Sequence, residues 1–185
     1  GYDLAAYTIS GVHGIATFVI SSASWQVMKS SPLDGEIEWA TTQVEGITIT
    51  NVYKPPGTRL NADDLPRYPQ PCIYTGDFNC HSTTWGYSST NPDGAALEDW
   101  ASMTDLSLVH DPKQPGSFRS ARWGTTTNPD LAFANLGLHT INRRVLDQFP
   151  KSQHRPSIVE SSAAIKTVPT RPVKRWNFRK ADWDS

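Results

Sequence analysis

The sequence predicts an α/β or α+β sandwich, in which sheets pack against each other or against helices. Three observations carry this prediction: many short runs of β-branched and aromatic residues, few stretches with helical spacing, and polar residues gathered where the runs end. The 185 residues, 37% of them hydrophobic, are enough for one domain with a sizeable core. Two separate large domains are therefore not expected.

Strands joined by tight connections are predicted in the first half of the chain. They cover an apolar run at residues 15–20, an alternating segment at 36–44 and a β-rich stretch at 47–53. Glu45 and Gly46 separate the last two and suit a hairpin turn. Pro55-Pro56-Gly57 then ends the strand, and three prolines within residues 61–71 leave room for at most one short helical turn.

A short buried strand at residues 72–75 and one helix are predicted next. Asp93 is expected to be the helix N-cap, and the apolar face comprises Ala96, Leu97, Trp100, Ala101 and Met103. Further strands are predicted at residues 107–110, 131–134, 142–147 and 157–163.

Composition excludes several classes of protein. A formal net charge of −1 with 19% charged residues excludes a disordered polyelectrolyte and a uniformly basic nucleic-acid coat. The longest apolar runs, such as residues 14–20, are far shorter than the roughly 20 residues that span a bilayer. Cys72 and Cys80 are too few for a disulfide framework and lack zinc-site spacing, so a reducing compartment and buried thiols are expected.

The charge is unevenly distributed. Residues 161–185 contain six Lys/Arg and two Asp/Glu, a net charge of +4, interleaved with prolines and aromatic residues. Such a segment suits phosphate contacts and base stacking, and it equally suits a solvated linker. Any nucleic-acid binding is therefore expected to be local.

Chemically useful side chains cluster at four predicted strand ends. Asp77 and Asn79 follow the buried strand at residues 72–75, and Gly76 between them and the strand lets the backbone turn. Tyr53 ends another strand, Asp130 opens a third, and His154 precedes the last. Alone, Asp77 and Asn79 also suit turn caps, and Tyr53 suits a core ring.

These four motifs, in this order, resemble the endonuclease/exonuclease/phosphatase superfamily over residues 1–163. Within it, the chain is most similar to the endonuclease domain of arthropod-type non-LTR retrotransposons. Gly76-Asp77-Phe78-Asn79-Cys80-His81 followed by Thr84-Trp85-Gly86, and the segment at residues 175–183, carry this narrower likeness. The resemblance implies a four-layer α/β/β/α sandwich of two mixed sheets, with residues 164–185 as a basic linker toward a reverse transcriptase domain.

The resemblance also implies DNA nicking by phosphodiester hydrolysis with Mg²⁺ or Mn²⁺, and hence an intracellular, nuclear site of action. His154 would contact the scissile phosphate and assist proton transfer, and Asp77 would orient or deprotonate the attacking water. Asn79 would hold the phosphate or that water, and Tyr53 would donate to a phosphate oxygen. Asp130 would pair with the histidine or lie near the metal, which Asp77 and Asp130 would hold.

Other side chains near these motifs are candidates for substrate binding. Arg155, Lys54 and His81 are expected phosphate or substrate contacts, with solvated surface charge as the alternative. Trp85 and Trp123 suit base stacking or burial equally.

The chain departs from the family pattern in two places. The strands that carry the family's Asn and its principal metal ligand, a Glu, are expected before Gly1, so the domain is expected to lack its first strands. Gln153 stands where the family has an Asp before the histidine; it can still accept a hydrogen bond, but it carries no charge to stabilise an imidazolium. The alternatives are therefore a catalytically inactive remnant that binds nucleic acid or protein, and a sugar- or lipid-phosphatase of the same superfamily.

Overall fold

A mixed six-stranded sheet forms the centre of the molecule. The computed structural model describes residues 1–162 except 12, 62, 136, 138–139 and 150. In spatial order the sheet contains β3 (Trp25–Ser30), β4 (Glu38–Val44), β5 (Ile47–Tyr53), β6 (Cys72–Asp77), β10 (Asp130–Asn135) and β7 (Ser107–Leu108). β5 and β6 run parallel, and the other neighbours are antiparallel.

Three two-stranded antiparallel sheets and one α-helix complete the described part. The small sheets pair β1 (Tyr2–Ser10) with β2 (His13–Ile20), β8 (Phe118–Arg119) with β9 (Thr126–Thr127), and β11 (Ile141–Val145) with β12 (Ser157–Ser161). The helix α1 spans Pro92–Met103, and a single 3₁₀ turn, η1, spans Thr83–Trp85.

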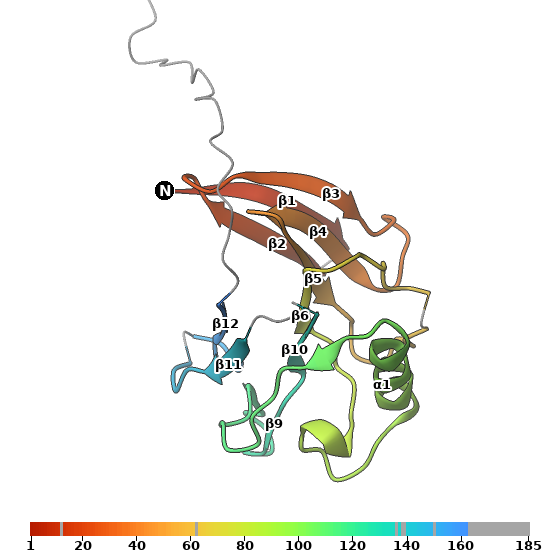
Figure 1. The fold of residues 1–185 in the computed structure, drawn as a ribbon. Coiled ribbons are helices and arrows are strands. Elements are labelled where there is room, and N and C mark those ends of the chain that lie inside the picture. Colours follow the sequence, from red (N-terminus) through yellow and green to blue (C-terminus); the bar gives the residue numbers. More distant parts are fainter. Residues whose placement is uncertain (12, 62, 136, 138–139, 150, 163–185) are drawn as a thin grey trace, which may run out of the picture.

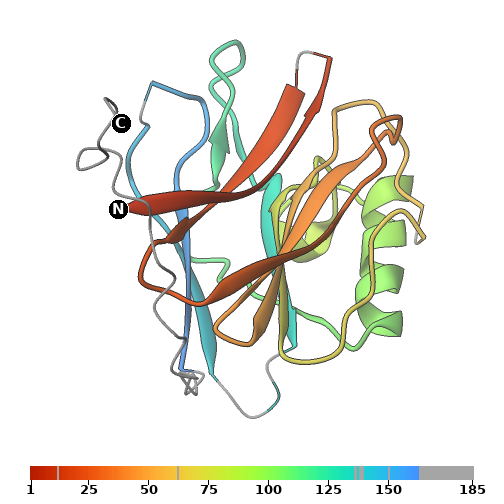
Figure 2. The same ribbon diagram turned by 90° about the horizontal axis from the view of Figure 1, so that it is seen from above.

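The two faces of the central sheet are buried differently. On one face Tyr74 packs edge-on against Trp100 of α1, with ring centroids 4.9 Å apart, in a core that also contains Val52. On the other face Ile73 belongs to a smaller core against which Ile141 and Val159 of the β11–β12 pair pack. The molecule is therefore an α/β sandwich, with α1 on one side of the sheet and the β-hairpins on the other (Figures 1 and 2).

The β1–β2 hairpin belongs to the same layer as β11–β12. Asn51 of β5 donates from its amide to the carbonyl of Ala16 in β2, at 3.2 Å, which ties the hairpin to the central sheet. The outward side of the hairpin exposes Tyr7 and Phe18. Within the described residues α1 is the sole α-helix, so the predicted outer helical layer over β1–β2 is not observed there.

Most predicted elements are confirmed with small changes of boundary. β5 has the predicted bounds, and Glu45 and Gly46 make the hairpin turn with φ of 49° and 84°, both in the left-handed region. The strands β1, β3, β8 and β9 were not predicted. The strand predicted at 157–163 is observed at Ser157–Ser161, and residue 163 lies outside the described residues.

The helix differs from its prediction at both ends. Asn91, not Asp93, is the N-cap: its side-chain oxygen accepts from Gly94 N at 2.7 Å, and Pro92 occupies the first turn. Met103 was predicted in the buried face but is 62% exposed, because it lies in the last turn of the helix, beyond the core contacts of Trp100.

The other sequence expectations have mixed outcomes. Cys72 and Cys80 are free and buried, as expected. Among the described residues, no helix is long and apolar enough to cross a membrane. The predicted basic linker at residues 164–185 lies outside the described residues.

Candidate active site

Three predicted site residues lie in one row across neighbouring strands. In the parallel pair, Tyr53 of β5 is aligned with Asp77 of β6, and in the antiparallel pair Asp130 of β10 is aligned with Asp77. Residues aligned across neighbouring strands have their side chains on the same face, a few ångströms apart. The register of the sheet therefore brings these three side chains together.

Gly76 makes this register possible. Its φ is +146°, and a Cβ added there would lie 1.9 Å from the carbonyl oxygen of Val52 in β5. Only glycine allows this approach of β6 to β5 beside Asp77.

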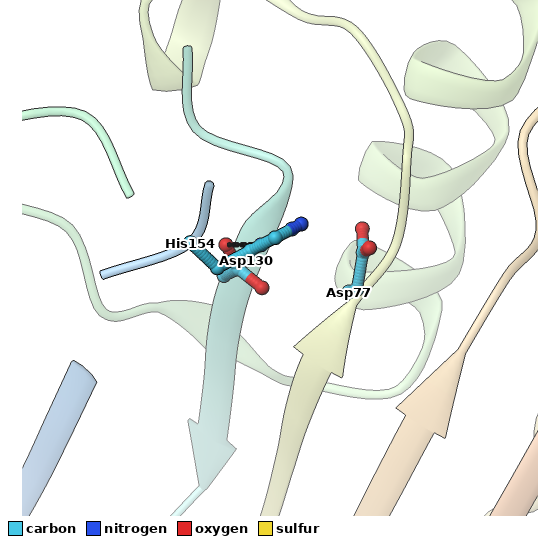
Figure 3. Close-up of side chains that lie close together, drawn as sticks. All are labelled: Asp77, Asp130 and His154. Carbon is cyan, nitrogen blue, oxygen red and sulfur yellow. Dashed lines mark hydrogen bonds and ion pairs between the residues drawn. The ribbon is translucent and has the colours of Figure 1, made fainter. Parts of the chain in front are cut away.

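His154 joins the row from the segment before β12. Its Nδ1 lies 2.9 Å from Oδ2 of Asp130, and its ring lies 4.9 Å from that of Phe118, with which it forms an isolated β-bridge. Ligand atoms of Asp77, Asp130 and His154 all lie within 4.8 Å of one another. Figure 3 shows the imidazole extending from beside Asp130 toward Asp77.

Burial and mutual repulsion shift the titration of this cluster. Burial, followed by the negative charge of Asp130, raises the pKa of Asp77 from 3.8 to about 6. The hydrogen bond to Asp130 raises the pKa of His154. His154 and Asn79 offset the upward shift of the Asp77 pKa only in part. Two close carboxylates beside an imidazole nitrogen form a donor set that fits a hard divalent cation such as Mg²⁺ or Mn²⁺.

A buried arginine that the sequence analysis did not single out supports this arrangement. Arg143 of β11 donates from Nη2 to the backbone carbonyl of Asp130 at 2.7 Å and to the hydroxyl of Ser157 at 3.2 Å. It thus ties Asp130, the first residue of β10, to Ser157, the first residue of β12. By alternation along β11, Arg143 shares the inward side with Ile141 and Val145, a pattern that indicates a buried cation but does not identify its partners.

Tyr53 has a partner that the sequence analysis also missed. Its hydroxyl lies 3.5 Å from Nδ1 of His13 in β2, and the two rings are 5.5 Å apart. Burial and then the charge of Asp77 raise the pKa of the phenol, so it remains a proton donor beside the cluster. His13 precedes a strand by sequence, but only the packing of β2 on β5 brings it to Tyr53.

Asn79 and His81 lie beyond the end of β6. The amide of Asn79 donates to the carbonyl of Lys54 at 3.0 Å, and its backbone N–H donates to Asp77 Oδ1 at 3.2 Å. His81 is exposed and stacks on Tyr87, with ring centroids 4.1 Å apart and planes 12° from parallel. Burial, with smaller contributions from the charges of Asp77 and Asp130, raises the pKa of Tyr87.

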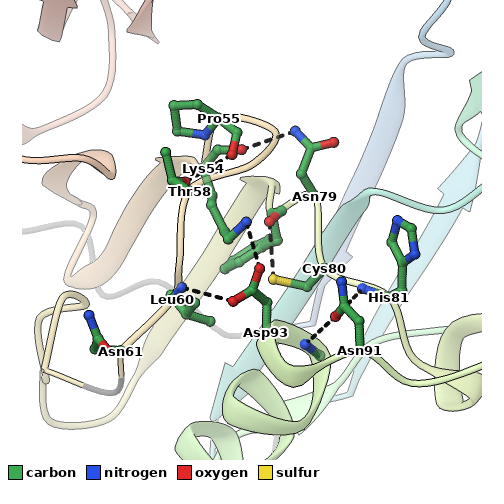
Figure 4. A network of polar contacts seen from close by, with 12 residues as sticks. Lys54, Pro55, Thr58, Leu60, Asn61, Asn79, Cys80, His81, Asn91 and Asp93 are labelled. Carbon is green, nitrogen blue, oxygen red and sulfur yellow. Dashed lines mark hydrogen bonds and ion pairs between the residues drawn. The ribbon is translucent and has the colours of Figure 1, made fainter.

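Lys54 was predicted to contact phosphate, and its position contradicts this. The side chain is 1% exposed, and its Nζ lies 3.1 Å from Asp93 Oδ2 of α1 (Figure 4). Asp93 also accepts from the backbone N–H of Leu60 at 3.1 Å, which explains why this residue is not the helix cap. Lys54 therefore joins β5 to α1 through a buried ion pair and has no surface to offer a substrate.

Arg155 is likewise occupied by structural contacts. Its Nη1 donates to the carbonyl of Gly116 at 2.7 Å, its Nη2 pairs with Asp147 at 3.3 Å, and its guanidinium lies 4.3 Å from the centroid of the Phe149 ring. In the arrangement described the guanidinium binds loop atoms on two sides, and the phosphate contact of Arg155 stays a prediction.

Gln153 is not the partner of the imidazole, and His154 is paired with Asp130, one of the two positions that the resemblance implied for this carboxylate. The carboxylate beside the imidazole is Asp130, from another strand. The side chain of Gln153 points elsewhere and accepts from the backbone N–H of Ala121, in the β8–β9 hairpin, at 2.7 Å.

The two tryptophans considered for base stacking have different positions. Trp85 is fully buried in the main core, and its indole N–H donates to Cys80 O at 2.9 Å. Trp123 is 70% exposed at the tip of the β8–β9 hairpin, and the Arg122 guanidinium lies 4.7 Å from its ring centroid. Of the two, only Trp123 is accessible to a ligand.

Known structures share this fold at low sequence identity. The endonuclease domain of TRAS1, a telomere-specific non-LTR retrotransposon, superposes with a TM-score of 0.60 at 19% identity, covering 83% of this chain and 78% of that domain. An endonuclease/exonuclease/phosphatase family protein from Leptotrichia buccalis gives 0.52 at 17% identity, covering 87% and 72%. A mannosyl-6-phosphatase from Bacteroides thetaiotaomicron gives 0.51 at 16% identity, covering 79% and 70%.

A family comparison extends from β5 to the start of β12. Residues 47–158 match the family described as endonuclease-reverse transcriptase, a segment that contains Tyr53, Asp77, Asp130 and His154. No curated protein matches the sequence. The match covers more than half of the chain, so the protein belongs to the endonuclease-reverse transcriptase family, within the endonuclease/exonuclease/phosphatase superfamily.

Proposed function

We propose that this protein is a divalent-metal-dependent endonuclease that nicks DNA. The observation that carries the proposal is the cluster of Asp77, Asp130 and His154, whose ligand atoms lie within 4.8 Å of one another at one end of the central sheet. In-line attack on a phosphodiester requires a positioned water, a proton donor and positive charge near the phosphoryl oxygens. The cluster and its rim contain side chains suited to each task.

Asp77 and His154 divide the proton transfers. Asp77 orients or deprotonates the attacking water. His154, kept protonated to higher pH by its bond to Asp130, contacts the scissile phosphate and supplies a proton on the side of the leaving oxygen. The Tyr53 hydroxyl donates to a phosphate oxygen, and Asn79 holds the turn that carries Asp77.

The metal would be held by the carboxylates of Asp77 and Asp130, with water completing its coordination. When bound, Mg²⁺ or Mn²⁺ supplies a Lewis acid that neutralises charge developing on the phosphoryl oxygens. The raised pKa of Asp77 supports this assignment, because a cation between the two carboxylates relieves the repulsion that contributes to it.

Features beside the cluster support DNA as the substrate. The hairpin at residues 118–127 contains two arginines and no acidic residue, and it exposes Trp123. This hairpin and the β1–β2 turn project at the same end of the molecule (Figure 2). Arginine side chains can bind the phosphates of the DNA backbone, and the exposed indole of Trp123 can contact bases or sugars.

The wider organisation follows from the same proposal. Residues 1–163 form the nuclease domain, residues 164–185 form a basic linker toward a reverse transcriptase domain, and the protein acts on DNA in the nucleus. A chain that binds DNA without cleaving it would instead be an inactive binding remnant.

Nicking of supercoiled plasmid tests the proposal. The chain is expected to convert supercoiled to open-circular DNA with Mg²⁺ or Mn²⁺ but not with EDTA, and Asp77→Asn is expected to lower the rate by at least about a hundredfold. Asp99→Asn, at an exposed carboxylate of α1, is the matched control and should cleave normally. Nicking that survives both EDTA and Asp77→Asn would overturn the proposal, and turnover of a small phosphomonoester without nicking would replace it with a phosphatase activity.

A further inference from the structure

Gln153 lies where two structural units meet. His154 follows it directly, and the β8–β9 hairpin lies beside it. The backbone N–H of Arg119 donates to the Gln153 carbonyl at 2.8 Å, and that of Arg155 donates to the Ser117 carbonyl at 2.7 Å. Together with the isolated bridge between Phe118 and His154, these bonds pair the segment before β12 with β8.

The side chain of Gln153 extends this pairing into the distal half of the hairpin. Its Oε1 accepts from Ala121 N at 2.7 Å, one residue beyond the turn residue Ser120. The tip is otherwise closed by bonds within itself: Ser120 N donates to Thr125 O at 2.9 Å, and Gly124 N to Ser120 O at 2.8 Å. Among the described residues outside the hairpin, Gln153 is the one whose side chain is hydrogen-bonded to residues 120–125.

The base of the hairpin is already held by other contacts. Asn128 accepts from Ser117 N at 3.2 Å and donates to Trp85 O at 3.0 Å. These contacts hold only the base of the hairpin, whereas Arg122 and Trp123 lie in its distal half, where Gln153 accepts from Ala121.

We propose that Gln153 is a positioning residue for substrate: it anchors the β8–β9 hairpin so that Arg122 and Trp123 face a DNA duplex bound at the cluster. The inference rests on the proposed function for its substrate. The anchoring role also explains why the residue is glutamine and not aspartate. The aspartate side chain is one carbon shorter, so its oxygens would lie farther from the Ala121 N–H. Glutamate has the same reach and keeps an oxygen acceptor.

The test combines a measurement without substrate with two measurements on DNA, using the full chain and its Gln153→Met, Gln153→Asp and Gln153→Glu variants. Gln148→Met, at an exposed glutamine of the preceding loop, is the matched control. Hydrogen exchange of the Ala121 amide is expected to be about three- to tenfold faster in the Met and Asp variants, the effect of losing one exposed hydrogen bond. The Glu and Gln148→Met variants should exchange like the parent chain.

The DNA measurements determine whether the anchor matters for substrate. In EDTA, the Kd for a duplex is expected to rise about three- to tenfold in the Met and Asp variants and to be restored in the Glu variant. With Mg²⁺, KM should rise by the same factor while kcat changes by less than about twofold, because the hairpin grips substrate without touching the reacting atoms.

Each outcome decides a different claim. Unchanged exchange at Ala121 together with an unchanged Kd in Gln153→Met would overturn the proposed anchoring role of Gln153. Faster cleavage by Gln153→Asp would also overturn it, because that result is expected if an aspartate at this position acts as a partner of His154. If no variant cleaves DNA but exchange and Kd follow the expected pattern, the anchor stands and the endonuclease proposal fails.

Discussion

Replacing Asp77 by asparagine removes a carboxylate that burial and Asp130 both disfavour in the folded protein. Its pKa is about 6, compared with an ordinary value of 3.8. The shift of roughly two units corresponds to about 3 kcal/mol of folding free energy, and solvent access at the site reduces the expected gain to about 1–2 kcal/mol. Asparagine keeps the oxygen that accepts from Asn79 N, so this hydrogen bond is retained.

The sign of the pH dependence follows from proton binding. Between about pH 4 and pH 6 the folded chain retains the Asp77 proton and the unfolded chain releases it, so the free energy of unfolding falls as pH rises. The Asp77→Asn variant has no carboxylate at this position, so its free energy of unfolding does not fall in this way. Its advantage over the parent chain should therefore be absent below about pH 4 and complete above about pH 7.

Urea titrations followed by circular dichroism, at intervals from pH 4 to pH 8 in EDTA, measure this difference. Asp99→Asn controls for loss of a carboxylate on the surface, and it should give no such dependence on pH. An Asp77→Asn variant that is no more stable at pH 8, or whose advantage is the same at every pH, would refute the repulsion that we assign to the cluster.

Three further predictions address other parts of the structure. Asp130→Asn should lower the pKa of His154, measured by imidazole NMR titration, because it removes the negative charge that makes this a charge-assisted hydrogen bond. The stability from this pair is present at low pH and lost as pH rises through the folded pKa, and an unmoved titration would contradict the pairing. Asp93→Asn should destabilise the fold by about 3 kcal/mol in urea titrations because it leaves buried Lys54 without a carboxylate, and a loss under about 1 kcal/mol would argue against the ion pair. Gly76→Ala should yield no cooperative thermal transition, since its Cβ overlaps a backbone carbonyl of β5; a normal transition would show that the register can relax.

The fold was predictable where local pattern and burial agree. β5 alternates between the two faces and ends at a Pro-Pro-Gly stop, and the Glu45-Gly46 turn has the backbone conformation that its composition favours. β3 was missed because its side chains are largely exposed and give no alternation of burial. β8 and β9 have two residues each, too few for any periodic signal.

The site was predictable in part because polar residues at strand ends lie at one end of a sheet. Tyr53, Asp77, Asp130 and His154 were each predicted at a strand end. The register of the sheet aligns the first three, and a hydrogen bond joins His154 to Asp130. The partner of His154 could not be identified by adjacency in the sequence, because the pairing spans two strands. The burial of Lys54 likewise could not be predicted, because its partner Asp93 belongs to α1 and meets Lys54 only in the folded structure.

We propose that the Asp77–Asp130–His154 cluster hydrolyses a DNA phosphodiester. Single-turnover nicking of supercoiled plasmid by the His154→Ala variant measures whether it does. With Mg²⁺ and excess protein, the rate is expected to fall by at least about a hundredfold relative to the parent chain, since a general acid contributes 10²–10⁴-fold. A thermal melt of the same preparation shows whether the variant is folded. Nicking at the parental rate by a folded His154→Ala protein would contradict the account.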